Sequence, residues 1–176
     1  MKKNNLIPHL RRQKQIDRLS SKFKLRGYNL QEHSYMVAVL FIQVCKQENI
    51  DITSEQIDYV LKHDLVEVVT ADLQFPVKNF NKTTENAWDI IEKEVVGKGY
   101  PELRNYIDIK DVLNDELYRI FKLCDCLDLW MFCTEEVRFG NSNPEISQVV
   151  NTCERLFEHY DPYHIYPYFW SILNDF

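Results

Sequence analysis

The sequence has few of the residues that end secondary structure. Its 176 residues include only four glycines and six prolines, and no Asn-Gly or Asp-Gly pair stands between alternating apolar runs. Such pairs mark the tight turns of β-hairpins. Their absence argues against a β-rich fold and favours long helices.

The chain also lacks a long apolar run and a block of basic residues. No stretch approaches the ~20 apolar residues of a membrane span, and the basic N-terminus is not followed by the apolar segment of a signal peptide. We therefore expect a cytoplasmic protein with no membrane association. The net charge of −6 disfavours binding to nucleic acid. A small phosphorylated ligand needs only one or two local cations and is compatible with this charge.

Cysteine pairs of the redox or metal-binding type are missing. The odd number of cysteines and the absent secretion signal indicate reduced thiols, which we expect to pack as small apolar residues. They are Cys45, Cys124, Cys126, Cys133 and Cys153.

What the chain does have is a large apolar fraction, 45% of its residues, arranged with helical periodicity. Thr53 and Gln56 form a capping box at the start of one helix, and Pro76 prevents its continuation. The segment 31–47 is apolar nearly all round, which is typical of a central helix. The tail after residue 158 forms irregular structure or a short last helix. We predict one all-α domain over residues 1–176, with helices at 3–15, 31–47, 53–72, 83–96, 101–107, 114–138 and 145–158.

Ionisable residues gather on the predicted helix that follows Thr53. Glu67 comes four residues after His63 and three after Asp64, so the three share one broad side of a helix. A metal at that helix edge would need ligands from other helices. His33 begins an apolar helix, and Asp125 lies inside an apolar run where a carboxylate is costly unless it is paired or binds a metal. Two imidazoles and two carboxylates suit a divalent transition metal such as Mn or Co better than magnesium.

Each of these residues also has an ordinary structural explanation. A lone His33 is more often a helix cap or a satisfied core residue than a ligand. The acidic residues after His63 could form a solvated helix face, and Asp125 could be a buried hydrogen-bond acceptor. The order His, His-Asp, Asp, with each residue on a predicted helix, favours the metal site.

Four stretches carry a resemblance to a known family. They are Pro8-His9-Leu10 through Arg18, then Glu32-His33-Ser34, then His63-Asp64-x-x-Glu67-x-x-x-x-Asp72-Leu73-x-x-Pro76-Val77-Lys78, and Lys122-x-x-Asp125. They resemble the HD-domain metal-dependent phosphohydrolases, and among these the YfbR-like bacterial 5′-deoxynucleotidases. The resemblance spans roughly residues 6–143. It implies a compact bundle of about six or seven helices and a homodimer.

The resemblance also implies roles for single residues. Glu67 would position or activate the attacking water, and Asp72 would donate a proton to the leaving 5′ oxygen. Arg18 would hold the phosphate, since a guanidinium pairs with phosphate bidentately. The metal ligands would be His33, His63, Asp64 and Asp125.

The sequence departs from the family next to Arg18. The family has a tryptophan there that is implicated in preference for the deoxy sugar, whereas this chain has Leu19. Leucine can crowd a 2′-hydroxyl but offers no indole ring, so we expect Leu19 to contact the substrate with altered sugar selectivity. Arg26 is a rival phosphate ligand, and Asp128 either lines the pocket or belongs to a buried network.

The favoured reaction is metal-dependent hydrolysis of a (deoxy)nucleoside 5′-monophosphate to nucleoside and phosphate. The first alternative is an HD-type hydrolase of deoxynucleoside triphosphates that releases triphosphate. Such an enzyme should need extra cations, and the candidates near the motifs are few: Lys22, Lys24, Arg26 and Lys78. The second alternative is a non-catalytic module that senses a nucleotide. Degenerate members of this kind usually lose a ligand or an acid, and this chain has them all.

Overall fold

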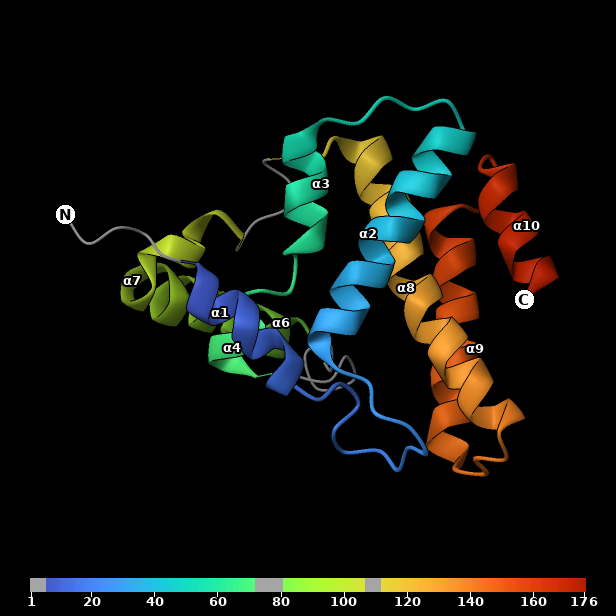
Figure 1. Cartoon of the computed structure of the whole chain (residues 1–176), viewed down its shortest axis with the longest axis horizontal. Helices are drawn as coiled ribbons and strands as arrows, with labels where there is room; N and C mark the ends of the chain where they lie inside the picture. The colour runs from blue at the N-terminus through green and yellow to red at the C-terminus, as the bar shows by residue number, and fades with distance from the viewer. Residues whose placement is uncertain (1–5, 72–80, 107–111) are drawn as a thin grey trace.

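The computed structural model describes residues 6–71, 81–106 and 112–176. Within these ranges the chain forms helices, turns and loops without a β-strand, apart from one isolated bridge between Asp17 and Asn29. The all-α prediction is confirmed. The described part holds nine α-helices, more than the six or seven expected, because the helix expected at 53–72 is divided in two and short helices form at 97–99 and in the tail (Figure 1).

The helices occupy most of the predicted segments, with changed ends. A 3₁₀ turn (Gln13–Gln15) follows the first helix, a π-helical turn (Glu92–Val96) follows the helix at 82–91, and a 3₁₀ helix (Pro101–Tyr106) replaces the helix expected at 101–107. The aromatic tail ends in a short helix at 167–175. The α-helices are α1 (Ile7–Arg12), α2 (Leu30–Gln47), α3 (Ser54–Leu61), α4 (Glu67–Thr70), α6 (Lys82–Ile91), α7 (Gly97–Gly99), α8 (Asp115–Arg138), α9 (Pro144–Tyr160) and α10 (Pro167–Asp175).

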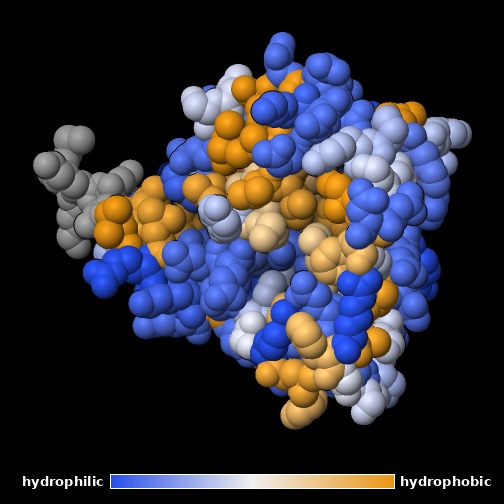
Figure 2. All heavy atoms as spheres, turned by 45° about the vertical axis from the view of Figure 1, so that its right-hand side comes forward, coloured by the Kyte–Doolittle hydropathy of each residue, from blue (hydrophilic) through white to orange (hydrophobic). Residues whose placement is uncertain are grey.

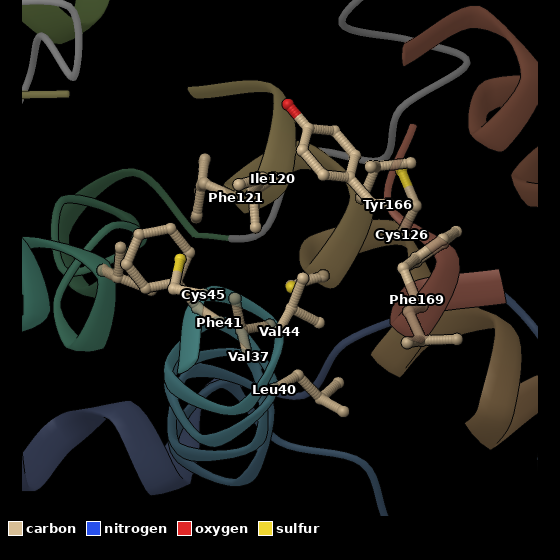
Figure 3. Packing of buried hydrophobic residues seen from close by; sticks show 14 of the residues in the cluster. Val37, Leu40, Phe41, Val44, Cys45, Ile120, Phe121, Cys126, Tyr166 and Phe169 are labelled. Atoms are coloured by element: carbon tan, nitrogen blue, oxygen red, sulfur yellow. The ribbon is translucent and has the colours of Figure 1, made fainter. Parts of the chain in front are cut away.

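The largest core lies between α2, α8 and α9. These three long helices lie side by side, with α8 antiparallel to both neighbours (Figure 1). Apolar residues of α2 point toward α8 and α10 (Figure 3), and Val37, Phe41 and Val44 are completely buried. Helix α2 is central, as its sequence predicted.

A second apolar cluster is formed by residues of α1, α4, the π-helical turn at 92–96 and the 3₁₀ helix at 101–106, together with neighbouring residues. It includes Leu30 from α2 and Leu65, Val66 and Val68 from the segment after α3. Val60, at the end of α3, packs instead into the large core. The chain therefore changes direction between residues 60 and 65, so that Val60 packs into one cluster and Leu65 into the other.

This change of direction corrects the prediction of one helix from 53 to 72. The capping box of Thr53 and Gln56 is present, but α3 ends at Leu61 and residues 62–66 form a series of turns. Their amides bond three residues back, as in Leu65 N to Lys62 O at 2.9 Å and Glu67 N to Asp64 O at 3.0 Å. His63, Asp64 and Glu67 therefore do not share one face of a regular helix.

All five cysteines are free and buried, as expected. Among the described residues, no helix is both long and apolar enough to cross a membrane. The face shown in Figure 2 has apolar side chains gathered in a band across its middle and again at its lower end, with hydrophilic side chains between them.

Candidate active site

Three segments that are far apart in the sequence bring the predicted metal ligands together. His33 comes from the first turn of α2, His63 and Asp64 from the turns after α3, and Asp125 from the middle of α8. One ligand atom each of His33, His63 and Asp64 lies within 4.8 Å of the others. His33 Nε2 is 3.6 Å from Asp64 Oδ2 and 3.2 Å from Asp125 Oδ1. His63 Nε2 is 3.1 Å from Asp64 Oδ2.

Hydrogen bonds at Nδ1 fix the orientation of both imidazoles. His63 Nδ1 bonds the carbonyl oxygen of Val60, in the last turn of α3, at 2.8 Å. His33 Nδ1 bonds Asp128 Oδ2 at 2.7 Å. Both contacts leave the Nε2 atom of each ring facing the carboxylates, and with a metal ion bound each ring would be the neutral Nδ1–H tautomer.

The two Nε2 atoms fit a metal ion. The His33 side chain is fully buried and that of His63 is 5% exposed, and neither Nε2 has a hydrogen bond to a residue that the structure describes. A buried nitrogen without a partner costs stability unless another ligand meets it. Two imidazoles and two carboxylates around one point form the mixed donor set of a divalent transition-metal site.

The carboxylates are held in the ionised form that metal binding requires. Burial by itself would raise the pKa of Asp64, but His63, Arg18 and His33 hold that pKa well below its usual range. Burial acts in the same way on Asp125, and Lys122 and the two histidines lower its pKa well below the usual range. Lys122 pairs with Asp125 Oδ2.

Two residues behind His33 were not predicted as site residues. Asp128 Oδ2 accepts hydrogen bonds from His33 Nδ1 at 2.7 Å and from the Tyr28 hydroxyl at 2.6 Å. Asp128 therefore belongs to a buried network, one of the two alternatives raised by its sequence. Its spacing of three residues from Asp125 places both on one face of α8. The sequence around Tyr28, in a loop before α2, carries no comparable signal.

Replacing Asp128 with alanine is expected to weaken metal binding by about 10- to 100-fold, because the outer partner orients the histidine ligand. Titration of the metal-free protein with Mn²⁺ or Co²⁺ measures this change. Asp115→Ala is a matched control, because Asp115 is an exposed acid at the start of the same helix. Equal affinity in the Asp128 variant would remove Asp128 from the site.

Arg18 lies against the predicted metal ligands. Its NH1 donates to Asp64 Oδ2 at 2.7 Å, and its guanidinium lies 5.7 Å from the centre of the Tyr28 ring. The backbone holds it there, because Arg18 N donates to Tyr28 O at 2.8 Å next to the Asp17–Asn29 bridge. Arg18 thus faces both the ligands and the cavity beside them.

Arg26, the rival phosphate ligand, lies elsewhere. It bonds Glu135 at 2.7 Å and Glu136 at 3.1 Å, and stacks on Phe132 and Phe139. Glu136 is completely buried. Arg26 therefore fastens its loop to the end of α8.

Of the remaining predicted residues, the structure describes Glu67 and Leu19. Glu67 is the first residue of α4, one turn after Asp64, and is half-buried. Leu19 is half-buried with a positive φ of 52°, a backbone conformation that is rare for a bulky residue and concentrated at functional sites. Asp72 and Lys78 lie outside the described residues.

A cavity of about 620 Å³ opens beside Arg18 and Asp125. The loop at 18–22, α8 and α9 form its walls, and Leu19 lines it. This volume is within the range of small-molecule sites.

Comparison with known proteins decides the family. The model of the family described as 5′-deoxynucleotidase YfbR-like matches residues 5–176. The chain belongs to this YfbR-like family. It is 32% identical over 155 residues to the 5′-deoxynucleotidase YfbR of Salmonella paratyphi B, covering 81% of this chain and 77% of that protein. A 5′-deoxynucleotidase of Shewanella oneidensis is 31% identical over 151 residues, with 79% and 77% covered.

Solved structures share the fold of this YfbR-like protein. An HD-domain phosphohydrolase from Listeria innocua superposes with a TM-score of 0.76 at 20% identity, covering 96% of this chain and 86% of that one. The HD phosphohydrolase DatZ of cyanophage S-2L, bound to dA and one catalytic Zn²⁺ ion, superposes with a TM-score of 0.66 at 18% identity, covering 89% and 82%. The fold is therefore of the HD type, and the family membership makes this chain a metal-dependent phosphohydrolase.

Proposed function

We propose that this YfbR-like protein hydrolyses (deoxy)nucleoside 5′-monophosphates to nucleoside and phosphate. The single observation that carries the proposal is the convergence of two unbonded imidazole nitrogens and two ionised carboxylates beside Arg18, at the edge of a cavity. The 5′-deoxynucleotidases among its relatives support the choice of substrate.

The proposed roles follow from the positions of the side chains. His33, His63, Asp64 and Asp125 would hold one divalent transition metal, with Mn or Co as the expected ions. A bound ion of this kind polarises the phosphoryl group and lowers the pKa of the attacking water. Arg18 would exchange its contact with Asp64 for the phosphate oxygens, which a guanidinium binds with two parallel hydrogen bonds.

The acids complete the reaction. Glu67, one turn beyond Asp64, would orient the water and accept its proton, as a carboxylate within hydrogen-bond reach can do. Asp72 keeps the role that the family resemblance implies, protonation of the leaving 5′ oxygen. We propose that residues 1–176 form a single catalytic domain. The homodimer stays a prediction.

The distribution of cations supports a monophosphate over a triphosphate. Of the four extra cations considered for β- and γ-phosphates, three are paired with acids. Lys24 bonds Asp17 at 2.7 Å, Arg26 bonds Glu135 at 2.7 Å, and Lys22 lies 3.7 Å from Glu145. The fourth, Lys78, lies outside the described residues. A longer phosphate chain would have to break these pairs.

A product screen tests the proposal. The metal-loaded protein is incubated with all common ribo- and deoxynucleotides, as mono- and triphosphates, with Mn²⁺, Co²⁺, Zn²⁺ and Mg²⁺. Release of inorganic phosphate and nucleoside from monophosphates is the expected result. Release of triphosphate would establish the alternative reaction, and binding without any turnover would establish a sensing module.

Leu19→Trp is expected to raise the ratio of kcat/KM for deoxy- over ribonucleotides about tenfold, because a larger side chain at the cavity wall crowds a 2′-hydroxyl and one steric contact is worth about that factor. Exchange of one bulky residue for another adds no new cost at the positive φ. Phosphate release from paired substrates, such as dAMP and AMP, measures the ratio.

The control for this variant is Leu25→Trp, in the same loop, where the leucine is exposed and outside the cavity lining. An unchanged deoxy-to-ribo ratio in Leu19→Trp would show that position 19 does not meet the sugar.

A further inference from the structure

The two oxygens of the Asp125 carboxylate face different groups. Oδ1 lies 3.2 Å from His33 Nε2, among the predicted metal ligands, whereas Oδ2 accepts a hydrogen bond from the ammonium group of Lys122. Lys122 and Asp125 are three residues apart on α8, so both side chains leave one face of the helix. Asp125 therefore presents one oxygen to the ligand cluster while Lys122 holds the other.

Lys122 is fixed beside the ligand cluster by more than its bond to Asp125. Its Nζ lies 5.4 Å from the centre of the Phe121 ring, which is within the range of a cation–π contact. The Phe121 ring in turn makes a T-shaped contact with His63, with 5.1 Å between the ring centres. Lys122 also lines the cavity beside Arg18. The ammonium group is thus placed by an ion pair and by an aromatic ring that packs on another predicted ligand.

Arg18 and Lys122 bond the carboxylates in different ways. Arg18 NH1 donates to Asp64 Oδ2 at 2.7 Å, and the same oxygen lies 3.1 Å from His63 Nε2. A metal ion among these ligands would compete with Arg18 for that oxygen, and Arg18 would then be available to the phosphate. Lys122 instead occupies Oδ2 of Asp125 and leaves Oδ1 to the cluster. Lys122 can therefore keep its bond when a metal ion is present.

The number of oxygens that a carboxylate gives to a metal ion affects the chemistry of the site. A carboxylate can bind a metal through one oxygen or through both, and in the second case it fills an additional coordination position. Catalytic sites keep a position open for water or substrate. Hydrogen bonds from outer residues orient the carboxylate ligands. A lysine that bonds one oxygen prevents the carboxylate from binding through both.

Resting on the function proposed above, we propose that Lys122 is a positioning residue that restricts Asp125 to one metal-binding oxygen, Oδ1. Lys122 acts through Asp125 and does not itself touch the reacting atoms. Its positive charge opposes that of the metal ion, so it lowers the affinity for metal while it keeps a coordination position open for the reaction. Removal of Lys122 should therefore separate metal binding from turnover. A lysine that merely supported the ligand would affect both in the same direction.

The variant that tests this is Lys122→Met, which keeps an unbranched side chain and removes the charge. It is expected to bind Co²⁺ at least as tightly as the wild type, because a second carboxylate oxygen becomes available and a repulsive charge is gone. Its kcat for phosphate release is expected to fall about 10- to 100-fold, the usual effect of losing an outer partner of a metal ligand. Calorimetric titration of the metal-free protein with Co²⁺ measures the affinity.

The visible absorption spectrum of the Co²⁺-loaded protein reports the coordination without any turnover. The d–d bands of Co²⁺ weaken as its coordination number rises. Lys122→Met is expected to show weaker bands than the wild type, because Asp125 then binds through both oxygens. Lys122→Arg keeps a cationic donor for Oδ2 and is expected to restore the wild-type spectrum and most of the turnover. Lys122→Ala is expected to behave as Lys122→Met and replaces it if the methionine variant does not fold.

Lys46→Met is the matched control, since it makes the same change at an exposed lysine in the last turn of α2. It is expected to match the wild type in affinity, spectrum and turnover. A loss of Co²⁺ affinity in Lys122→Met would show that Lys122 only supports Asp125, and would overturn the proposal. An unchanged spectrum would overturn it as well. If the wild type released no phosphate from any nucleotide, the proposed reaction would fail while the Co²⁺ spectra still tested Lys122.

Discussion

His63→Ala is expected to abolish metal retention and to lower kcat/KM for phosphate release by about 10³-fold or more, because the reaction depends on a metal-activated water. The Nε2 atom of His63 is buried 3.1 Å from Asp64 Oδ2 and has no hydrogen bond to a described residue. Removing it takes away one of the two proposed nitrogen ligands. Metal content after dialysis, measured by mass spectrometry, and phosphate release together check the result.

His159→Ala is the matched control, since His159 is an exposed histidine on α9. It should retain metal and activity. Circular dichroism and thermal unfolding of the metal-free proteins show whether His63→Ala still folds. Full metal retention by a folded His63→Ala protein would refute the assignment of the site.

Glu67→Gln is expected to keep the metal and to lose about 10²- to 10⁴-fold in kcat, the usual contribution of a general base. Glutamine has the same shape as glutamate but accepts no proton at neutral pH. The acidic limb of the kcat profile against pH should flatten as well, because that limb reports ionisation of the base. A merely structural role for Glu67 would leave the shape of the profile unchanged.

Glu55→Gln makes the same change at an exposed glutamate of α3 and should behave as the wild type. Loss of metal from Glu67→Gln would make Glu67 a ligand instead of a base. Undiminished turnover with normal metal content would remove Glu67 from the catalytic machinery.

The helical fold was predictable because its signals are local. The capping box at Thr53, the apolar surface of 31–47 and the scarcity of glycine and proline act within a few residues of each other. The ends of α2 and α8 follow the sequence to within one residue. The turns at 62–66 were not predictable, because no glycine or proline marks them. They form because Val60 and Leu65 pack into two different apolar clusters.

The residue types of the candidate site were likewise predictable from the sequence, and its geometry was not. The residue types and their order, His33, then His63 and Asp64, then Asp125, could be read from the sequence, since a carboxylate within an apolar run needs a partner. The distances between them could not, because α2, the turns after α3 and α8 meet only when the large core forms. Asp128 and Tyr28, which orient His33, were likewise decided by that packing.

The sequence by itself therefore determined the all-α class, the family and the chemical character of the site, because composition, periodicity and motif order are properties of the chain. Only the tertiary structure decided which cations are already paired, where Arg18 and Arg26 point, and which cavity adjoins the proposed metal ligands. Those features depend on contacts between residues about 50 to more than 100 positions apart, such as Arg18 with Asp64 and Arg26 with Glu136. No local pattern encodes such pairs, because their free energy comes from burial that exists only in the folded chain.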